Sequence, residues 1–210
     1  MRFLKQLAAH IYRVNEGVGK PMAALVDGLN DRIGAAIRWL ALLMVLVGAA
    51  TALLRYFARG LELSLNLTPP TEAQWYLFSV IFLLGAAYGL NHNVHVRVDV
   101  LYERLSRKGR AIIDLVGTII FLIPFSLVML YVSWPAVANS FSIREVSPDP
   151  GGLARWPIKM LILVSFVLLT LQGLSQIVKQ IDILGREGDG DGSAPAEGTP
   201  EAAPAPETSA

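Results

Sequence analysis

The 210-residue sequence contains no cysteine, only three histidines and little charge. The absence of cysteine excludes disulfides, thiolate zinc sites, cysteine-ligated iron–sulfur clusters and a cysteine nucleophile. Asp, Glu, Lys and Arg make up 17% of the residues, whereas soluble domains carry about 25%. The net charge of +1 argues against a nucleic-acid partner, because nucleic-acid binding needs a concentrated basic face.

Hydrophobic residues make up 53% of the chain, and the mean hydropathy is +0.49. Four apolar stretches without charge stand out, at residues 39–54, 75–90, 115–143 and 160–178. A helix that crosses a hydrocarbon core of about 30 Å needs roughly 20 residues. The sequence therefore predicts an all-α membrane protein. Its transmembrane domain is expected over residues 37–183, with four helices at about 37–56, 73–90, 111–134 and 158–181.

Segments of different composition flank this domain. Within residues 1–36, apolar side chains from Phe3 to Tyr12 recur at helical spacing, which predicts an amphipathic helix on the membrane surface or, alternatively, a solvated arm. Residues 184–210 are rich in Gly, Ala, Pro and acidic residues, a composition typical of a disordered tail. A second short interfacial helix is expected directly after Asp99.

Lysine and arginine placement predicts the orientation. With a cytoplasmic N-terminus, 13 of the 18 basic residues lie inside and 5 outside, so both termini are expected in the cytoplasm. The four tryptophans lie at predicted span ends, where interfacial aromatic residues collect. They are Trp39, Trp75, Trp134 and Trp156.

The second span ends in an alternating run, His95-Val96-Arg97-Val98-Asp99. Such a run keeps an apolar surface while the chain leaves the bilayer core. Arg97 and Asp99 are predicted to form an ion pair at this exit; Asp99 is equally well placed to cap the helix that follows. His92 and His95 lie three residues apart and could share a metal, but interfacial histidines are the better interpretation.

The predicted spans contain few side chains that could take part in catalysis or ion binding. The middle of every predicted span is uncharged, and no serine has the glycines of a nucleophile elbow. We therefore expect no enzyme activity, no catalytic residue, no metal and no cofactor. Gly85 and Gly89 lie one turn apart and would let another helix approach closely, either within this chain or from a partner.

Two charged residues, Arg55 and Glu72, lie at span ends outside the membrane. They are expected to be satisfied by headgroups or caps, or to contact a partner. Thr71 is predicted to be the N-cap of the second span, with Gln74 completing a capping box.

Together these motifs resemble the DctQ-like small membrane subunit of tripartite ATP-independent periplasmic (TRAP) transporters. The resemblance rests on Arg55-Tyr56, Glu72, Trp75, Gly85-Ala86-Ala87 and, above all, His95-Val96-Arg97-Val98-Asp99, and it covers residues 37–181. The loop from Ser147 to Gly152, followed by Arg155-Trp156, is similar to the branch labelled mannitol/chloroaromatic. Many relatives carry two adjacent acids before the second span, whereas this chain has only Glu72.

The resemblance implies a non-catalytic, multi-pass subunit of the bacterial inner membrane. Its expected partners are the lipid bilayer, a large elevator-type subunit that carries the sodium and substrate sites, and a periplasmic solute-binding protein. The small subunit would scaffold the large one and help to dock the binding protein, for ion-coupled import of an organic acid. Two alternatives stay open: an autonomous small transporter or channel, and a membrane adaptor unrelated to transport.

Overall fold

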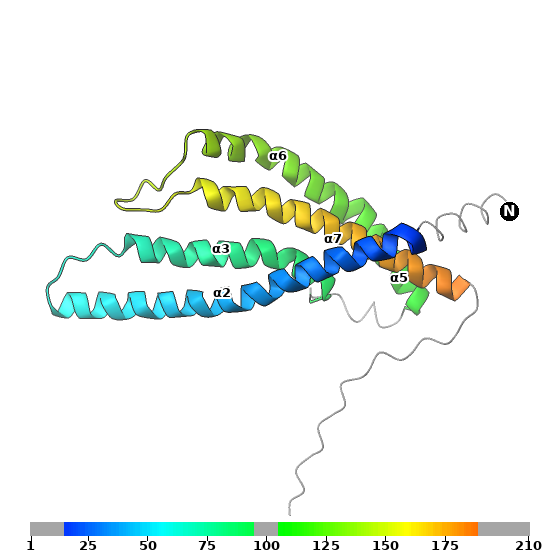
Figure 1. Cartoon of the computed structure of the whole chain (residues 1–210), viewed down its shortest axis with the longest axis horizontal. Coiled ribbons are helices and arrows are strands. Elements are labelled where there is room, and N and C mark those ends of the chain that lie inside the picture. The colour runs from blue at the N-terminus through cyan, green and yellow to red at the C-terminus, as the bar shows by residue number, and fades with distance from the viewer. Residues whose placement is uncertain (1–14, 95–104, 189–210) are drawn as a thin grey trace, which may run out of the picture.

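The structure is a computed structural model that describes residues 15–94 and 105–188. Two helical hairpins dominate it (Figure 1). The first joins α2 (Lys20–Gly60) to α3 (Thr68–Asn91), and the second joins α6 (Ile123–Ser142) to α7 (Trp156–Gly188). A π-helical turn, η1 (Asn15–Gly19), precedes α2. A shorter helix, α5 (Arg107–Gly117), continues through a second π turn, η2 (Thr118–Leu122), into α6.

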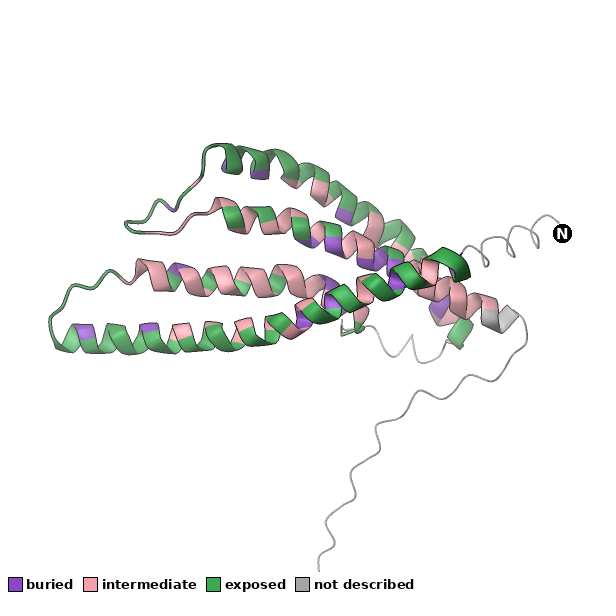
Figure 2. Ribbon diagram, in the orientation of Figure 1, coloured by how far each residue is buried: buried purple, intermediate pink, exposed green. Residues whose placement is uncertain are grey.

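Four helical segments are long and apolar enough to cross a membrane: Asn15–Gly60, Thr68–Asn91, Arg107–Ser142 and Trp156–Gly185. The predicted all-α fold with four spanning helices is therefore confirmed. Large apolar side chains are exposed along their outer faces, such as Phe121 at 72% and Val45 at 61%. Figure 2 shows this pattern, with few buried residues along the outward sides of the helices. In a bilayer such faces contact lipid or other membrane helices rather than water.

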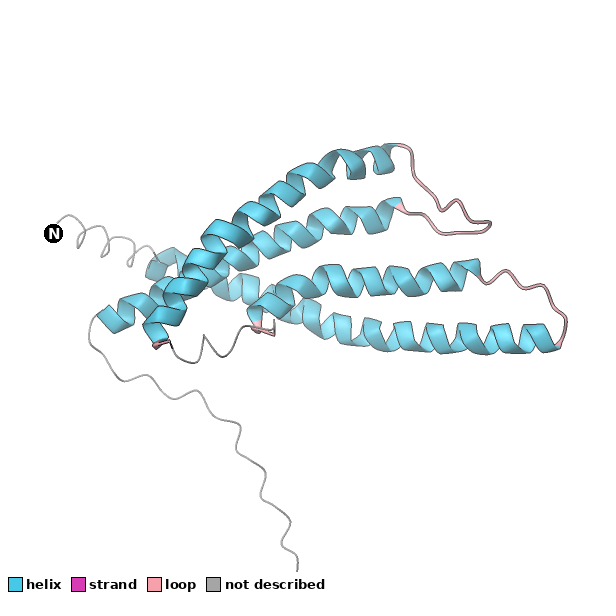
Figure 3. Ribbon diagram, turned by 180° about the vertical axis from the view of Figure 1, so that it is seen from behind, coloured by secondary structure: helices cyan, strands magenta, loops and turns pink. Residues whose placement is uncertain are grey.

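The two ends of the bundle differ. One end, here called the loop end, carries the connections 61–67 and 143–155; the latter is called the long loop (Figure 3). At the opposite end, here called the crossing end, the start of α2 passes over α7 (Figure 1). There Lys20 pairs with Asp182 at 2.7 Å, and Asn15 donates a hydrogen bond to the carbonyl of Val178.

Helix α2 is longer than one membrane crossing requires. Its 41 residues measure roughly 60 Å at 1.5 Å each, about twice the thickness of the hydrocarbon core. Its apolar stretch begins only at Trp39, so residues 20–36 extend the same helix beyond the core at the crossing end. The helix predicted over residues 3–12 and most of the one predicted after Asp99 lie outside the described residues.

The start of α3 corrects one prediction. The helix begins at Thr68, with Leu67 at the N-cap position, so Thr71 lies inside the first turn and the predicted capping box is wrong. The hydroxyl of Thr71 donates instead to the Leu67 carbonyl, at 2.8 Å. The reason is the Pro69-Pro70 pair, which occupies the first helical positions, where a missing backbone N–H costs nothing.

The third span contains a local change of helix type. The π turn η2 ends two residues before Pro124, whose backbone nitrogen has no hydrogen to donate. Opposite this turn, α7 carries Gly173, where a Cβ atom would lie 2.9 Å from Ile123 Cδ1. The glycine therefore allows α7 to approach the turn closely.

Candidate functional site

Helices α2 and α3 pack through small residues. A Cβ atom on Gly34 would lie 2.3 Å from the ring of Tyr88, so only glycine permits this approach. Further along, Gly85 faces Ile37, and Gly89 and Ala87 are buried. The two glycines singled out from the sequence thus lie on the side of α3 that packs within this chain.

At the loop end, Glu72 is buried, with 4% of its surface exposed. Its carboxylate accepts hydrogen bonds from the hydroxyl of Ser147 and from the backbone N–H of Leu153, both in the long loop. A buried carboxylate is tolerated only where donors satisfy it, and here two donors come from a segment about 75 to 81 residues away in the chain. Glu72 therefore ties the start of α3 to the long loop.

Other contacts strengthen this junction. Asn66 donates to the carbonyl of Pro150 at 3.0 Å, and the hydroxyl of Tyr76 donates to the carbonyl of Ala154 at 3.0 Å. Gly151 has φ +75°, and a Cβ atom there would lie 2.6 Å from Asn66 Nδ2. Glycine is required here both by the backbone conformation and by the close contact.

Two basic residues at or just after the end of the long loop, Arg155 and Lys159, have partners at the loop end. Lys159 pairs with Glu145 at 2.5 Å, and the hydrogen bond from its ammonium is the main reason that the pKa of Glu145 lies below its ordinary value. The Arg155 guanidinium lies 6.0 Å from the centre of the Trp75 ring, within the range of a cation–π contact.

A cavity of about 420 Å³ opens at this end, between the two connections and the start of α3. Arg55, Glu72, Trp75 and Asp149 are among the residues that line it. The structure therefore brings Arg55, Glu72 and Trp75 together, with Arg155 beside Trp75. The remaining nominated residues of the alternating run, His95, Arg97 and Asp99, lie outside the described residues.

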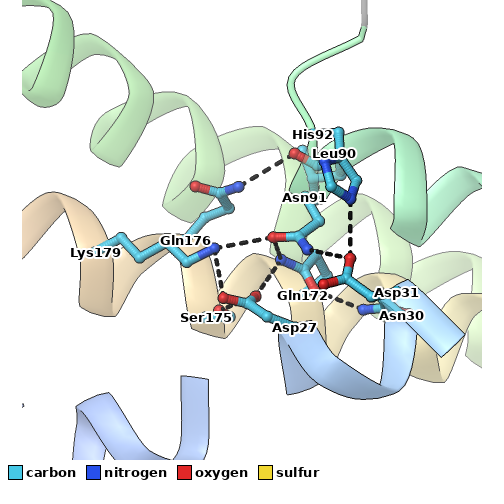
Figure 4. A network of polar contacts seen from close by, with 10 residues as sticks. All are labelled: Asp27, Asn30, Asp31, Leu90, Asn91, His92, Gln172, Ser175, Gln176 and Lys179. Carbon is cyan, nitrogen blue, oxygen red and sulfur yellow. Dashed lines mark hydrogen bonds and ion pairs between the residues drawn. The ribbon is translucent and has the colours of Figure 1, made fainter. Parts of the chain in front are cut away.

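A second polar cluster lies at the crossing end, where α2, α3 and α7 meet (Figure 4). Its centre is Gln172 of α7, which is fully buried. Its side-chain carbonyl accepts from Asn30 Nδ2 at 2.5 Å, and its amide donates to Asp27 at 3.0 Å and to Asn91 at 3.1 Å. One glutamine thus bonds side chains from two other helices.

Charged groups complete this cluster. Lys179 pairs with Asp27 at 2.7 Å and donates to Asn91 at 2.9 Å. Asn91 in turn donates to Asp31, which also contacts His92 Nε2 at 2.9 Å (Figure 4). Of these residues only His92 was considered from the sequence, as an interfacial histidine in preference to a metal ligand, and none of the others was predicted as a site residue. A signal was present, however, because Gln172, Ser175, Gln176 and Lys179 recur at i, i+3, i+4 and i+7, which places polar groups on one face of an apolar helix.

The fold and these two junctions define a multi-pass membrane protein with four spanning helices. Polar contacts join three helices at the crossing end and join α3 to the long loop at the loop end. Comparison with protein families matches residues 44–182 to "Tripartite ATP-independent periplasmic transporters, DctQ component". The chain belongs to this family and is a small component of a TRAP transporter in the inner membrane. Comparisons with curated proteins and with solved structures found no match.

Proposed function

We propose that this chain is the fixed scaffold of its transporter. It would hold the large elevator-type subunit in place and help to dock the periplasmic solute-binding protein during ion-coupled import of an organic acid. Both termini would lie in the cytoplasm, as the 13 to 5 distribution of basic residues favours, with the loop end in the periplasm. The transmembrane domain would cover residues 37–183.

The observation that carries the scaffold proposal is the placement of polar side chains. The charged side chains that make described contacts between segments lie at the two ends of the bundle. Between the ends the described polar contacts involve uncharged hydroxyls: Ser165 donates to a backbone carbonyl, and Thr170 contacts the Ser126 hydroxyl and a backbone carbonyl. A solute path usually presents ionisable groups or broken helices near the middle of the membrane. This arrangement supports a rigid body that moves no solute itself.

The docking proposal rests on the loop end. Glu72 and Asn66 hold the two connections together, so a partner would meet a surface that is already ordered. Arg55 is exposed beside the cavity and offers a charge to a partner. We assign Arg55 to this surface and Glu72 to its support; Trp75 and Arg155 lie beside it. For His95, Arg97 and Asp99, which lie outside the described residues, we propose a role at the contact with the large subunit.

The test is co-purification from native membranes. A tagged full-length chain, extracted in mild detergent, should bring a much larger multi-span protein with it. In that complex, Arg55→Ala should weaken docking of the binding protein several-fold without releasing the large subunit, because charges at an interface rim act mainly on association. Arg59→Ala, one turn further along α2, is the matched control and should have little effect.

Three results would overturn all or part of the proposal. Recovery of a stable chain without a large protein would remove the scaffold role. Solute flux through liposomes that contain this chain alone would support the autonomous transporter instead. Equal loss of docking in the Arg55 and Arg59 variants would refute the assigned docking surface while leaving the scaffold role intact.

A further inference from the structure

A groove runs between α3 and α7 in the half of the bundle next to the loop end. Its volume is about 410 Å³, and its walls are mainly apolar. The α3 wall includes Phe78, Phe82 and Leu83, and the α7 wall includes Ile158 and Ile162. The groove ends where the helices touch, because Ser165 of α7 donates a hydrogen bond to the Leu83 carbonyl at 2.6 Å.

The length of the groove corresponds to one leaflet of a bilayer. From Trp75 to Leu83 the helix rises about 12 Å, and half of a hydrocarbon core is about 15 Å. Trp75 marks the mouth of the groove at the level where interfacial aromatic residues lie. The groove therefore extends from the headgroup region to near the middle of the membrane.

Two basic side chains, Arg155 and Lys159, line the mouth of this apolar groove. Lys159 is already paired with Glu145. Arg155 forms no ion pair within the described part of the chain. Its side chain donates a hydrogen bond to Ser147 Oγ at 3.5 Å and lies 6.0 Å from the centre of the Trp75 ring. Its Nε is buried without an acceptor among those residues. Glu72 accepts from Ser147 and Leu153 instead. A guanidinium carries five N–H donors, so the terminal nitrogens of Arg155 retain donors for an external acceptor.

We propose that this groove binds one phospholipid of the leaflet next to the loop end. The phosphate accepts hydrogen bonds from the Arg155 guanidinium, and one acyl chain fills the space between α3 and α7. A phosphate matches the guanidinium geometry, and a hydrocarbon chain matches the apolar walls. The bound lipid would complete the packing between the two hairpins at the point where their helices separate.

The test is native mass spectrometry of the full-length chain after delipidation, titrated with palmitoyl-oleoyl phosphatidylethanolamine. The wild type should retain one lipid tightly, and Arg155→Gln should weaken this binding about tenfold, the effect of losing one hydrogen bond to a charged group. Ser79→Leu, which adds bulk to the groove wall, should weaken it similarly. The controls Arg59→Gln and Ala50→Leu change exposed positions of α2 and should alter binding less than twofold.

A second probe separates phosphate recognition from general lipid adhesion. The diacylglycerol with the same chains lacks a phosphate, so it should bind weakly and should not distinguish wild type from Arg155→Gln. Equal binding of both lipids, or equal losses in the Arg155 and Arg59 variants, would overturn the proposal.

A crosslinking experiment tests the same site in the native membrane and does not depend on variants that remove contacts. Phe82→p-benzoylphenylalanine places a photoreactive group in the groove wall. After irradiation, an adduct with the mass of a phospholipid that survives delipidation supports the proposal. A crosslink to another protein chain would overturn it, because a partner subunit would then occupy the groove.

Discussion

Replacing Gln172 with leucine should destabilise the crossing end more than any other single amide substitution on α7. The change keeps the size and helical propensity of the side chain but removes three hydrogen bonds, to Asn30, Asp27 and Asn91. Interhelical hydrogen bonds in membrane proteins contribute about 0.6 kcal/mol each on average, so the three account for about 2 kcal/mol.

A second contribution comes from the group left behind. Asn30 is fully buried, and its amide would lose the acceptor it has in Gln172. An unsatisfied buried donor costs about 1–3 kcal/mol, part of which leucine offsets by packing. We therefore expect Gln172→Leu to lower the free energy of unfolding by about 2–4 kcal/mol, measured by circular dichroism during titration of mixed micelles with sodium dodecyl sulfate.

The matched control lies one turn further along the same helix. Gln176 is also buried, but it makes one described hydrogen bond, to the carbonyl of Leu90 at 3.1 Å. Gln176→Leu should therefore cost only about 1 kcal/mol. A double variant with Asn30→Ala should lose less than the sum of its two single variants, because both remove the same bond. Equal losses for Gln172→Leu and Gln176→Leu would refute the reasoning.

Three further predictions concern packing and the loop end. Gly34→Ala should destabilise the chain by about 1–3 kcal/mol through overpacking. Gly28→Ala should instead stabilise α2 by about 0.5–1 kcal/mol, because its added Cβ atom would have nothing within 4 Å. The two variants should shift the thermal unfolding temperature in opposite directions, and equal shifts would contradict the prediction. Glu72→Gln should increase amide hydrogen exchange in the long loop, because the two hydrogen bonds from this loop would then go to a neutral amide instead of a carboxylate. Unchanged exchange would show that Glu72 does not hold the long loop to α3. Acid should loosen the Lys159–Glu145 pair, because the folded-state pKa of Glu145 lies below its unfolded value of about 4.3. The pair's contribution to the free energy of unfolding is complete above that unfolded value and is lost as the pH falls through the lower folded pKa. Tryptophan fluorescence, measured as a function of pH, can follow this loss. Lys159→Met should lack this transition, and an unchanged transition in that variant would assign it to another group.

The spanning helices could be predicted from the sequence because burial in lipid requires long apolar stretches, such as residues 39–54, and these are visible in the chain itself. Helix ends were less predictable. Thr71 and Gln74 have the spacing of a capping box, but Pro69 and Pro70 started α3 one turn earlier. Local spacing cannot show which of two competing start signals prevails.

The polar junctions could be predicted only in part. Glu72 was recognised as a charged residue at a span end, yet its partners Ser147 and Leu153 lie far away in the sequence, and no local pattern identifies them. For Gln172 the helical spacing of polar residues was informative, whereas its bonds to Asn30 and Asn91 depend on how three helices cross. Contacts of this kind follow from tertiary geometry.

The π turn η2 has a consequence for how this chain could vary. It contains one residue more than regular α-helical geometry would use, so every side chain after it is rotated by about 100° from the position in an uninterrupted helix. This rotation directs Ser126 toward Thr170, where their hydroxyls meet at 2.9 Å. A deletion of one residue within 118–122 would turn the whole of α6 about its axis and exchange the side chains it presents to α7 and to lipid. This short turn is therefore a position where a single insertion or deletion can produce a new helix surface while α2 and α3 keep their sequences.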